Sequence, residues 1–107
     1  MSYRVVVQPP ARLDIAAAHA YLHDRAPRAA DRWLDKLEQA IASLTDMPRR
    51  CGIAPESKEF PEEIRQLLHG RRGGVYRVLF VVPGDEVRVL DVRHGARQPM
   101  RANEIQP

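Results

Sequence analysis

The stretch Gly74–Arg97 reads GVYRVLFVVPGDEVRVLDVRHGAR and decides the fold of this chain. Two valine-rich runs, VYRVLFVV and EVRVLDVRH, flank the short link PGDE. Strand-forming residues on both sides of a Gly-containing link are typical of a β-hairpin. Arg77 lies inside the first run, while Arg93, His94 and Arg97 lie at or beyond the end of the second. The stretch therefore predicts a hairpin that belongs to the core and also carries positive charge.

The simplest hairpin register places Val82 opposite Val87, and Arg77 then pairs with Val92. Because side chains alternate along a strand, Arg77 and His94 become diagonal neighbours on one face of the sheet. A buried, unpaired guanidinium is prohibitively costly, so Arg77 must be paired or open to water. The register thus raises the question of which anion Arg77 meets.

Two explanations for Arg77 stay open. The first is a structural salt bridge to a glutamate of the preceding loop, the candidates being Glu56, Glu59 and Glu62. The second is a cationic patch on an uncovered sheet face, which would gather Arg65, Arg77, His94 and Arg97. Spacing alone slightly favours the salt bridge, whereas the convergence of cations at one end of the sheet favours the patch.

Upstream of the hairpin, the chain predicts a strand and two helices. Tyr3–Gln8 is a short β-rich run before two prolines, which suits an edge strand. Residues 11–25 predict a first helix, with an apolar stripe of Leu13, Ala16, Ala17, Ala20 and Leu22. Pro27 suits the first turn of a second helix. Its continuous apolar face runs from Ala30 to Leu44, and Pro48 stops it.

The predicted fold class is α+β. After a proline-rich loop at residues 47–62, Ile64–Gly70 adds one more strand before the hairpin. We expect an N-terminal strand, an antiparallel helix hairpin and then a three-stranded antiparallel meander, all in one sheet with the helices packed on one face. No predicted element covers the other face.

Length and composition indicate a single domain of residues 1–107, with 98–107 as a loose polar tail. The chain shows no membrane span or signal peptide, and its single cysteine, Cys51, suits a reducing cytoplasm. The net charge is +3; residues 1–63 have 9 Lys+Arg against 10 Asp+Glu, and residues 64–107 have 8 against 4. An arginine-rich second half favours an anionic partner, although GC-rich codon usage explains the composition equally well.

Other motifs carry little functional signal. His19 and His23 stand four apart on a helix, but the catalytic glutamate of a zinc-protease motif is absent. The sequence GRRGG (Gly70–Gly74) is a strand-connecting turn rather than a phosphate loop. Trp33 lies on the apolar stripe as a core residue. The two arginines Arg49 and Arg50 are expected to lie in a solvent-exposed loop. We therefore expect no metal and no cofactor.

The ordered set IRQLLHG, YRVLFVV and VRVLDVRHGAR, after a helix hairpin that ends in L-x-x-x-P, resembles the RelE/ParE superfamily of type II toxins. The resemblance covers Tyr3–Arg97. It implies a small toxin that a co-expressed antitoxin neutralises by wrapping its active surface. It also implies a cytoplasmic hetero-oligomer, with DNA gyrase or ribosome-bound mRNA as the target.

The resemblance allows two mechanisms. RelE-like members are ribosome-dependent mRNA endoribonucleases, in which basic residues orient the 2′-hydroxyl and stabilise the phosphorane. The positions that match are Arg77, His94 and Arg97, with help from Arg65. ParE-like members instead inhibit DNA gyrase. The absence of a tyrosine after Tyr76, and of a lysine cluster beside Lys58, favours the ParE-like alternative.

The expected function is therefore a ParE-like inhibitor, with an mRNA endoribonuclease as the alternative. A degenerate toxin that only binds its antitoxin is the third possibility. The residues expected to bind the target or the antitoxin are Arg65, Arg77, Arg93, His94 and Arg97.

Overall fold

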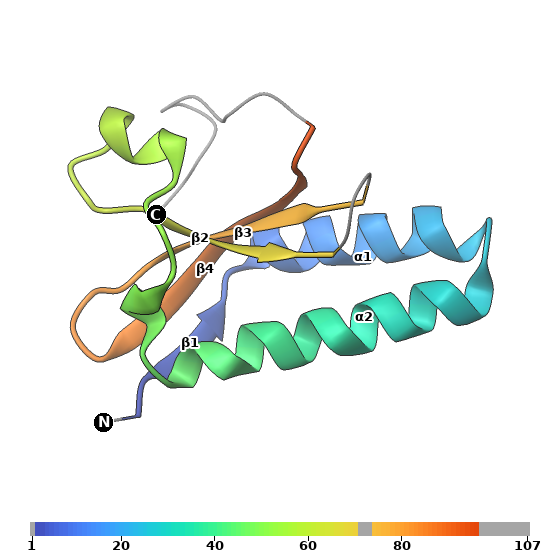
Figure 1. The fold of residues 1–107 in the computed structure, drawn as a ribbon, viewed down its shortest axis with the longest axis horizontal. Helices are drawn as coiled ribbons and strands as arrows, with labels where there is room; N and C mark the ends of the chain where they lie inside the picture. Colours follow the sequence, from blue (N-terminus) through green and yellow to red (C-terminus); the bar gives the residue numbers. More distant parts are fainter. Residues whose placement is uncertain (1, 71–73, 97–107) are drawn as a thin grey trace.

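The computed structural model describes residues 2–70 and 74–96 (Figure 1). The strands are β1 (Arg4–Val7), β2 (Arg65–His69), β3 (Tyr76–Val81) and β4 (Glu86–His94), and the helices are α1 (Pro9–His23) and α2 (Pro27–Ala42). Three short 3-10 turns follow α2: η1 (Ser43–Thr45), η2 (Pro48–Arg50) and η3 (Pro55–Glu59). The strands form one sheet in the order β1-β4-β3-β2, with β1 parallel to β4 and the other pairs antiparallel. The predicted α+β fold class, the edge position of the first strand and the meander are confirmed.

The two helices form an antiparallel hairpin that packs on one face of the sheet (Figure 1). Prolines begin both helices, where their missing N–H groups cost nothing. Helix α2 buries Ala30, Leu37 and Ile41, as its apolar stripe predicts, and the last two belong to the core cluster with the strands. It ends at Ala42 rather than at Pro48, because a 3-10 turn takes over the last residues of the stripe.

The apolar stripe predicted for α1 is wrong. Leu13 is 72% exposed, whereas Ala11 and Ile15 pack into the core. Alanines give the pattern little weight, because each buries so little area. A polar contact instead fixes how α1 sits: the Asp14 carboxylate accepts a hydrogen bond from the backbone N–H of Val92 at 3.0 Å. The β1–β4 pairing extends only to Val89, so Asp14 satisfies a strand donor that β1 does not reach.

The β3–β4 register differs from the prediction beyond one irregularity. Near the turn, Phe80 lies opposite Val89 as the simplest register requires, but Leu79 lies opposite Asp91. One extra residue in β4 therefore forms a β-bulge, which shifts every pair further from the turn. As a result Arg77 lies opposite Arg93, and Tyr76 rather than Val75 lies opposite His94. The predicted Arg77–His94 neighbours are on opposite faces of the sheet.

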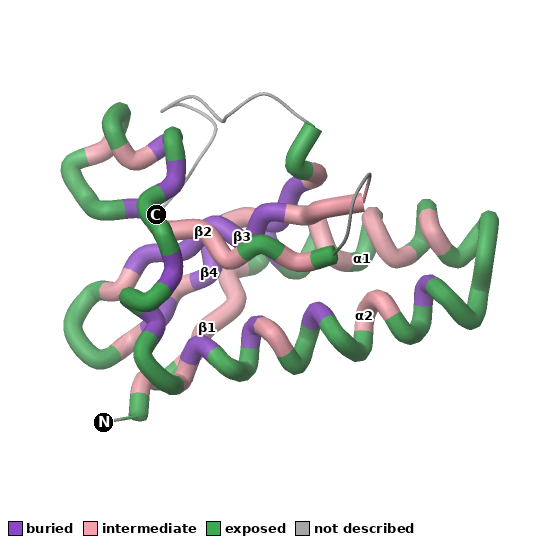
Figure 2. Tube along the Cα trace, in the orientation of Figure 1, coloured by how far each residue is buried: buried purple, intermediate pink, exposed green. Residues whose placement is uncertain are grey.

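The second face of the sheet is covered, contrary to expectation. A small core of Ala54, Ile64, Leu79, Val81 and Leu90 forms there, with Phe60 packed against it. The segment that carries η3 lies on the side of the sheet away from α1 and α2 (Figure 1). Figure 2 shows buried positions in this segment as well as in the central strands. The proline-rich loop therefore acts as a third layer, which its lack of periodicity hides.

Strand β1 is held at the sheet edge by a charged contact as well as by its backbone. Glu86 accepts hydrogen bonds from Arg4 at 2.8 Å and from Arg88 at 2.8 Å. These bonds lower the pKa of Glu86 below its ordinary value. The stability that this contact contributes is therefore fully present above the pKa of Glu86 in the unfolded chain. It is lost as the pH falls through the lower pKa of the folded protein.

This contact predicts an acid-sensitive strand edge. The carboxyl carbon of Glu86, followed by NMR, should titrate with a midpoint below 4.5, the ordinary value for a glutamate. The midpoint should move back toward that value in the Arg4→Gln variant, since Arg4 is the largest cause of the shift. A midpoint at or above 4.5 in the unaltered protein would contradict the assignment.

Candidate binding site

Arg77 forms a buried, fully paired ion pair. It is 7% exposed, and its partner Glu56 is 1% exposed. The guanidinium donates Nη1 to Glu56 Oε2 at 2.9 Å and Nη2 to the other carboxylate oxygen, while Nε donates to Gln66 Oε1 at 3.0 Å. This is the bidentate arrangement that neutralises both charges with good geometry. Of the two explanations for Arg77, the structure has the salt bridge, with Glu56 as the partner.

The remaining predicted cations do not gather into an open patch. Arg93, opposite Arg77, is 5% exposed. The Arg65 side chain is 16% exposed, and its Nη atoms donate to the Cys51 carbonyl and the Glu63 carboxylate, both at 2.6 Å. Arg97, the tail at 98–107 and positions 71–73 of the GRRGG turn lie outside the described residues. Binding roles for these residues stay predictions, but the expected convergence of Arg65, Arg77 and His94 does not occur.

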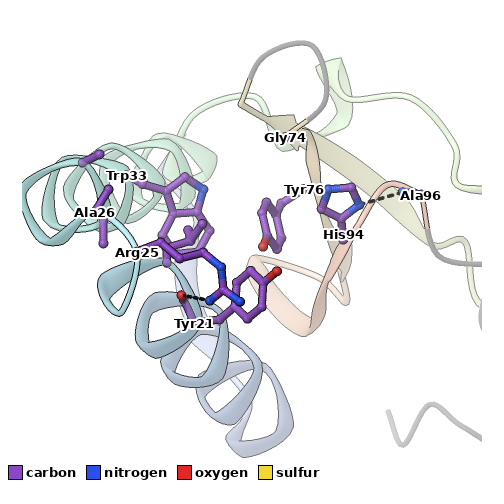
Figure 3. A pocket seen from close by; sticks show the side chains of 11 residues that line it. Tyr21, Arg25, Ala26, Trp33, Gly74, Tyr76, His94 and Ala96 are labelled. Carbon is purple, nitrogen blue, oxygen red and sulfur yellow. Dashed lines mark hydrogen bonds between the residues drawn. The ribbon is translucent and has the colours of Figure 1, made fainter.

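A different cavity contains His94. It has a volume of about 780 Å³ and lies where the tip of the helix hairpin meets the ends of β3 and β4 (Figure 3). We call it the hairpin-tip pocket. The side chains that define it are Tyr21, Arg25, Trp33, Tyr76 and His94. Leu22 and alanines at the start of α2 complete its apolar surface.

Three aromatic rings form one wall of the hairpin-tip pocket. Trp33 meets Tyr76 edge-on with ring centroids 5.0 Å apart, and Tyr76 meets His94 edge-on at 5.2 Å. Such contacts hold the rings in defined positions. Burial raises the pKa of Tyr76, so its hydroxyl keeps its proton and remains a donor. His94 Nδ1 accepts the Ala96 backbone N–H at 3.0 Å, so Nε2 is the ring nitrogen that carries the N–H.

The opposite side of the pocket carries a fixed positive charge. Arg25, in the link between α1 and α2, donates Nη1 to the backbone carbonyl of Tyr21 at 2.8 Å. Its guanidinium carbon lies 3.7 Å from the centroid of the Tyr21 ring, a cation–π contact. Figure 3 shows this guanidinium stacked on Tyr21, with Trp33 beyond it. None of the described residues that line the cavity is acidic.

Comparison with known proteins identifies the family. A family model described as the ParE toxin of the type II toxin–antitoxin system parDE matches residues 5–99. This chain belongs to the ParE toxin family. Toxin RelE1 of Caulobacter vibrioides is 33% identical over 99 residues, which cover 92% of this chain and 99% of the relative. A chain of the chromosomal ParDE system from P. aeruginosa shares the fold, with a TM-score of 0.71 at 18% identity over 87% of this chain and 96% of that chain.

The predicted membership of the RelE/ParE superfamily of type II toxins is confirmed. A cognate antitoxin is the partner that membership in a toxin–antitoxin family implies. Within residues 2–70 and 74–96, no helix of this ParE-family toxin is long and apolar enough to cross a membrane. The same ranges contain no group of three or more His, Cys, Asp or Glu side chains that would hold a metal ion. The His19 imidazole contacts the Asp31 carboxylate at 2.9 Å instead.

Sequence reasoning finds one residue of the hairpin-tip pocket in this ParE-family toxin and misses the rest. His94 is predicted as a site residue, whereas Trp33 is predicted as a core residue. Trp33 is only partly buried: it packs against the main core and lines the cavity. Its position could have indicated that it lies at the edge of the core, because it comes four residues before Leu37, the first fully buried large side chain of α2. One helical turn from Leu37, Trp33 meets the ring of Tyr76 at the start of β3, so its side chain both packs on the sheet and borders the cavity.

Proposed function

We propose that this toxin arrests growth by binding and inhibiting an essential target, DNA gyrase, and that its antitoxin neutralises it in the cytoplasm. The observation that supports binding over RNA cleavage is the buried Arg77–Glu56 pair. An endoribonuclease of the RelE kind needs cations that reach the scissile phosphate and stabilise its developing charge. A guanidinium that already pairs with a carboxylate in the interior offers that phosphate no net charge.

The neighbouring cations support the same proposal. Arg93 is almost fully buried, and Arg65 donates to two backbone carbonyls and a carboxylate. His94 lies on the helix side of the sheet beside Tyr76, so it is separated from Arg77 by the sheet itself. General acid–base catalysis beside a charge-stabilising cation requires both groups on one substrate. Among the described residues, none of Arg65, Arg77 and Arg93 is placed to stabilise charge on a substrate that His94 could also reach.

The experiment compares two assays on the same purified toxin. We expect inhibition of plasmid supercoiling by gyrase at toxin concentrations close to that of the enzyme. We also expect no ribosome-dependent cleavage of mRNA, measured by primer extension on stalled ribosomes. Relief of gyrase inhibition by the purified antitoxin is the matched control.

The outcomes of the two assays distinguish the gyrase inhibitor from the two alternative functions. Ribosome-dependent cleavage without gyrase inhibition would replace the proposal by the mRNA endoribonuclease. Neither activity, together with tight antitoxin binding and no growth arrest on expression, would indicate a degenerate toxin. The name of the relative Toxin RelE1 makes the ribosome assay necessary, since it is 33% identical to this chain.

A further inference from the structure

We infer that the hairpin-tip pocket is an anchor site for the antitoxin: it takes a large apolar side chain from a segment that also carries a carboxylate, and Arg25 pairs with that carboxylate. This inference rests on the proposed toxin–antitoxin function. It adds the surface, the chemistry of the bound segment and the residues that select it.

The size and surface of the pocket fit a side chain with its backbone. Its volume of about 780 Å³ exceeds that of any single side chain and lies within the usual range of ligand cavities. Leu22, Ala26, Ala29 and Ala30 contribute methyl groups on the helix side, and aromatic edges face them. An apolar anchor seated there removes water from both surfaces, which is how hot-spot side chains gain most of their affinity.

Several polar groups around the pocket can donate hydrogen bonds. Trp33 Nε1 is buried and has no hydrogen-bond partner among residues 2–70 and 74–96. Tyr76 keeps its hydroxyl proton, and His94, whose Nδ1 accepts the Ala96 N–H, offers Nε2–H. Arg25 has five N–H groups, of which one donates to the Tyr21 carbonyl. A bound segment must therefore bring acceptors, and backbone carbonyls with a carboxylate supply them without adding a donor.

The charge of the pocket selects an acidic segment. Arg25 brings a full positive charge, and no acidic side chain lines the cavity among the described residues. The guanidinium is already held by the Tyr21 ring and carbonyl, so little conformational freedom is lost when a carboxylate pairs with it. An Arg–carboxylate pair formed there discriminates against a lysine at the same position in the partner, because the lysine would meet a like charge.

A nucleotide fits the same cavity less well. Bases bind proteins by stacking on open aromatic faces. Here Arg25 covers one face of Tyr21, and Tyr76 meets both Trp33 and His94 edge to face. A side chain that packs against ring edges suits this arrangement better than a flat base does.

The test uses Trp33 itself as the reporter, since the chain contains a single tryptophan. The toxin is titrated with the antitoxin from the adjacent reading frame, and then with 15-residue peptides that tile that antitoxin. We expect one acidic, apolar peptide to shift the Trp33 emission to shorter wavelength. Arg25→Glu and Ala29→Phe, which reverse the charge and fill the cavity from an exposed helix position, should each weaken this binding at least about thirtyfold.

Matched variants control for charge and bulk at exposed helix positions outside the pocket. Arg32→Glu and Ala17→Phe should bind within about twofold of the unaltered toxin, because surface changes away from an interface cost little. Equal binding by all four variants would overturn the inference, and so would an emission shift caused by AMP or GMP alone. Gyrase inhibition is measured without antitoxin, so failure of the anchor site is distinguishable from failure of the proposed function.

Discussion

Replacing Glu56 with glutamine should lower the free energy of unfolding by about 3 to 5 kcal/mol, because Arg77 is then left as an uncompensated buried charge. Both side chains are almost completely buried, and two hydrogen bonds join them directly. A glutamine keeps the shape of the side chain but removes the negative charge. The loss is large against the total of about 5 to 15 kcal/mol that holds a typical domain folded. Urea unfolding followed by circular dichroism measures it.

Two further variants show whether the charge or the contact matters. Glu59→Gln changes an exposed glutamate of the same 3-10 turn and should stay within about 0.5 kcal/mol of the unaltered protein. The double variant Glu56→Leu with Arg77→Met should recover most of the lost stability, because apolar pairs often replace buried ion pairs without loss. Breaking a buried ion pair usually costs several kcal/mol. If the free energy of unfolding of Glu56→Gln lay within about 1 kcal/mol of the unaltered protein, Arg77 would not depend on Glu56 for its charge compensation.

Replacing Phe80 with alanine should cost about 3 to 5 kcal/mol, through lost burial and the cavity left behind. Phe80 is 0% exposed and belongs to the cluster where α2 meets the central strands. Its neighbours in that cluster, Leu37 and Val89, come from two different elements, so neither closes the gap alone. Thermal and urea unfolding should both report the loss.

Leu68→Ala is the matched control for Phe80→Ala, since Leu68 is a strand residue that is 59% exposed. Its replacement should cost less than about 0.5 kcal/mol. Equal losses at the two positions would contradict the assignment of the core to the helix-facing side of β3.

The sequence predicts the elements of this fold well because each has a strong local signal. Pro27 marks the start of α2 as predicted, and the valine runs mark β3 and β4 within one residue, whereas α1 begins at Pro9, two residues before its predicted start. The register is harder, because one extra residue in β4 reverses which side of the sheet the later side chains face. Nothing in the alternation of VRVLDVRH shows where a bulge falls. This one irregularity separates Arg77 from His94 and removes the predicted cationic patch.

Two other features depend on contacts between distant parts of the chain. The loop at residues 47–62 has no period, so its packing over Leu79 and Leu90 is invisible until the fold is known. The hairpin-tip pocket needs Arg25 from the helix link, Trp33 from α2 and Tyr76 from β3 at one place. None of these residues forms a motif with the others. Glu56 is among the glutamates predicted to pair with Arg77, because a buried arginine needs an anionic partner.

The most direct test of the central claim is a gyrase supercoiling assay with the Glu56→Leu, Arg77→Met double variant. If the toxin acts by binding and Arg77 is structural, the folded double variant should inhibit gyrase as well as the unaltered toxin does. Ribosome-dependent mRNA cleavage should be absent from both proteins. Cleavage by the unaltered toxin that disappears in the folded double variant would contradict the account and make Arg77 a catalytic residue.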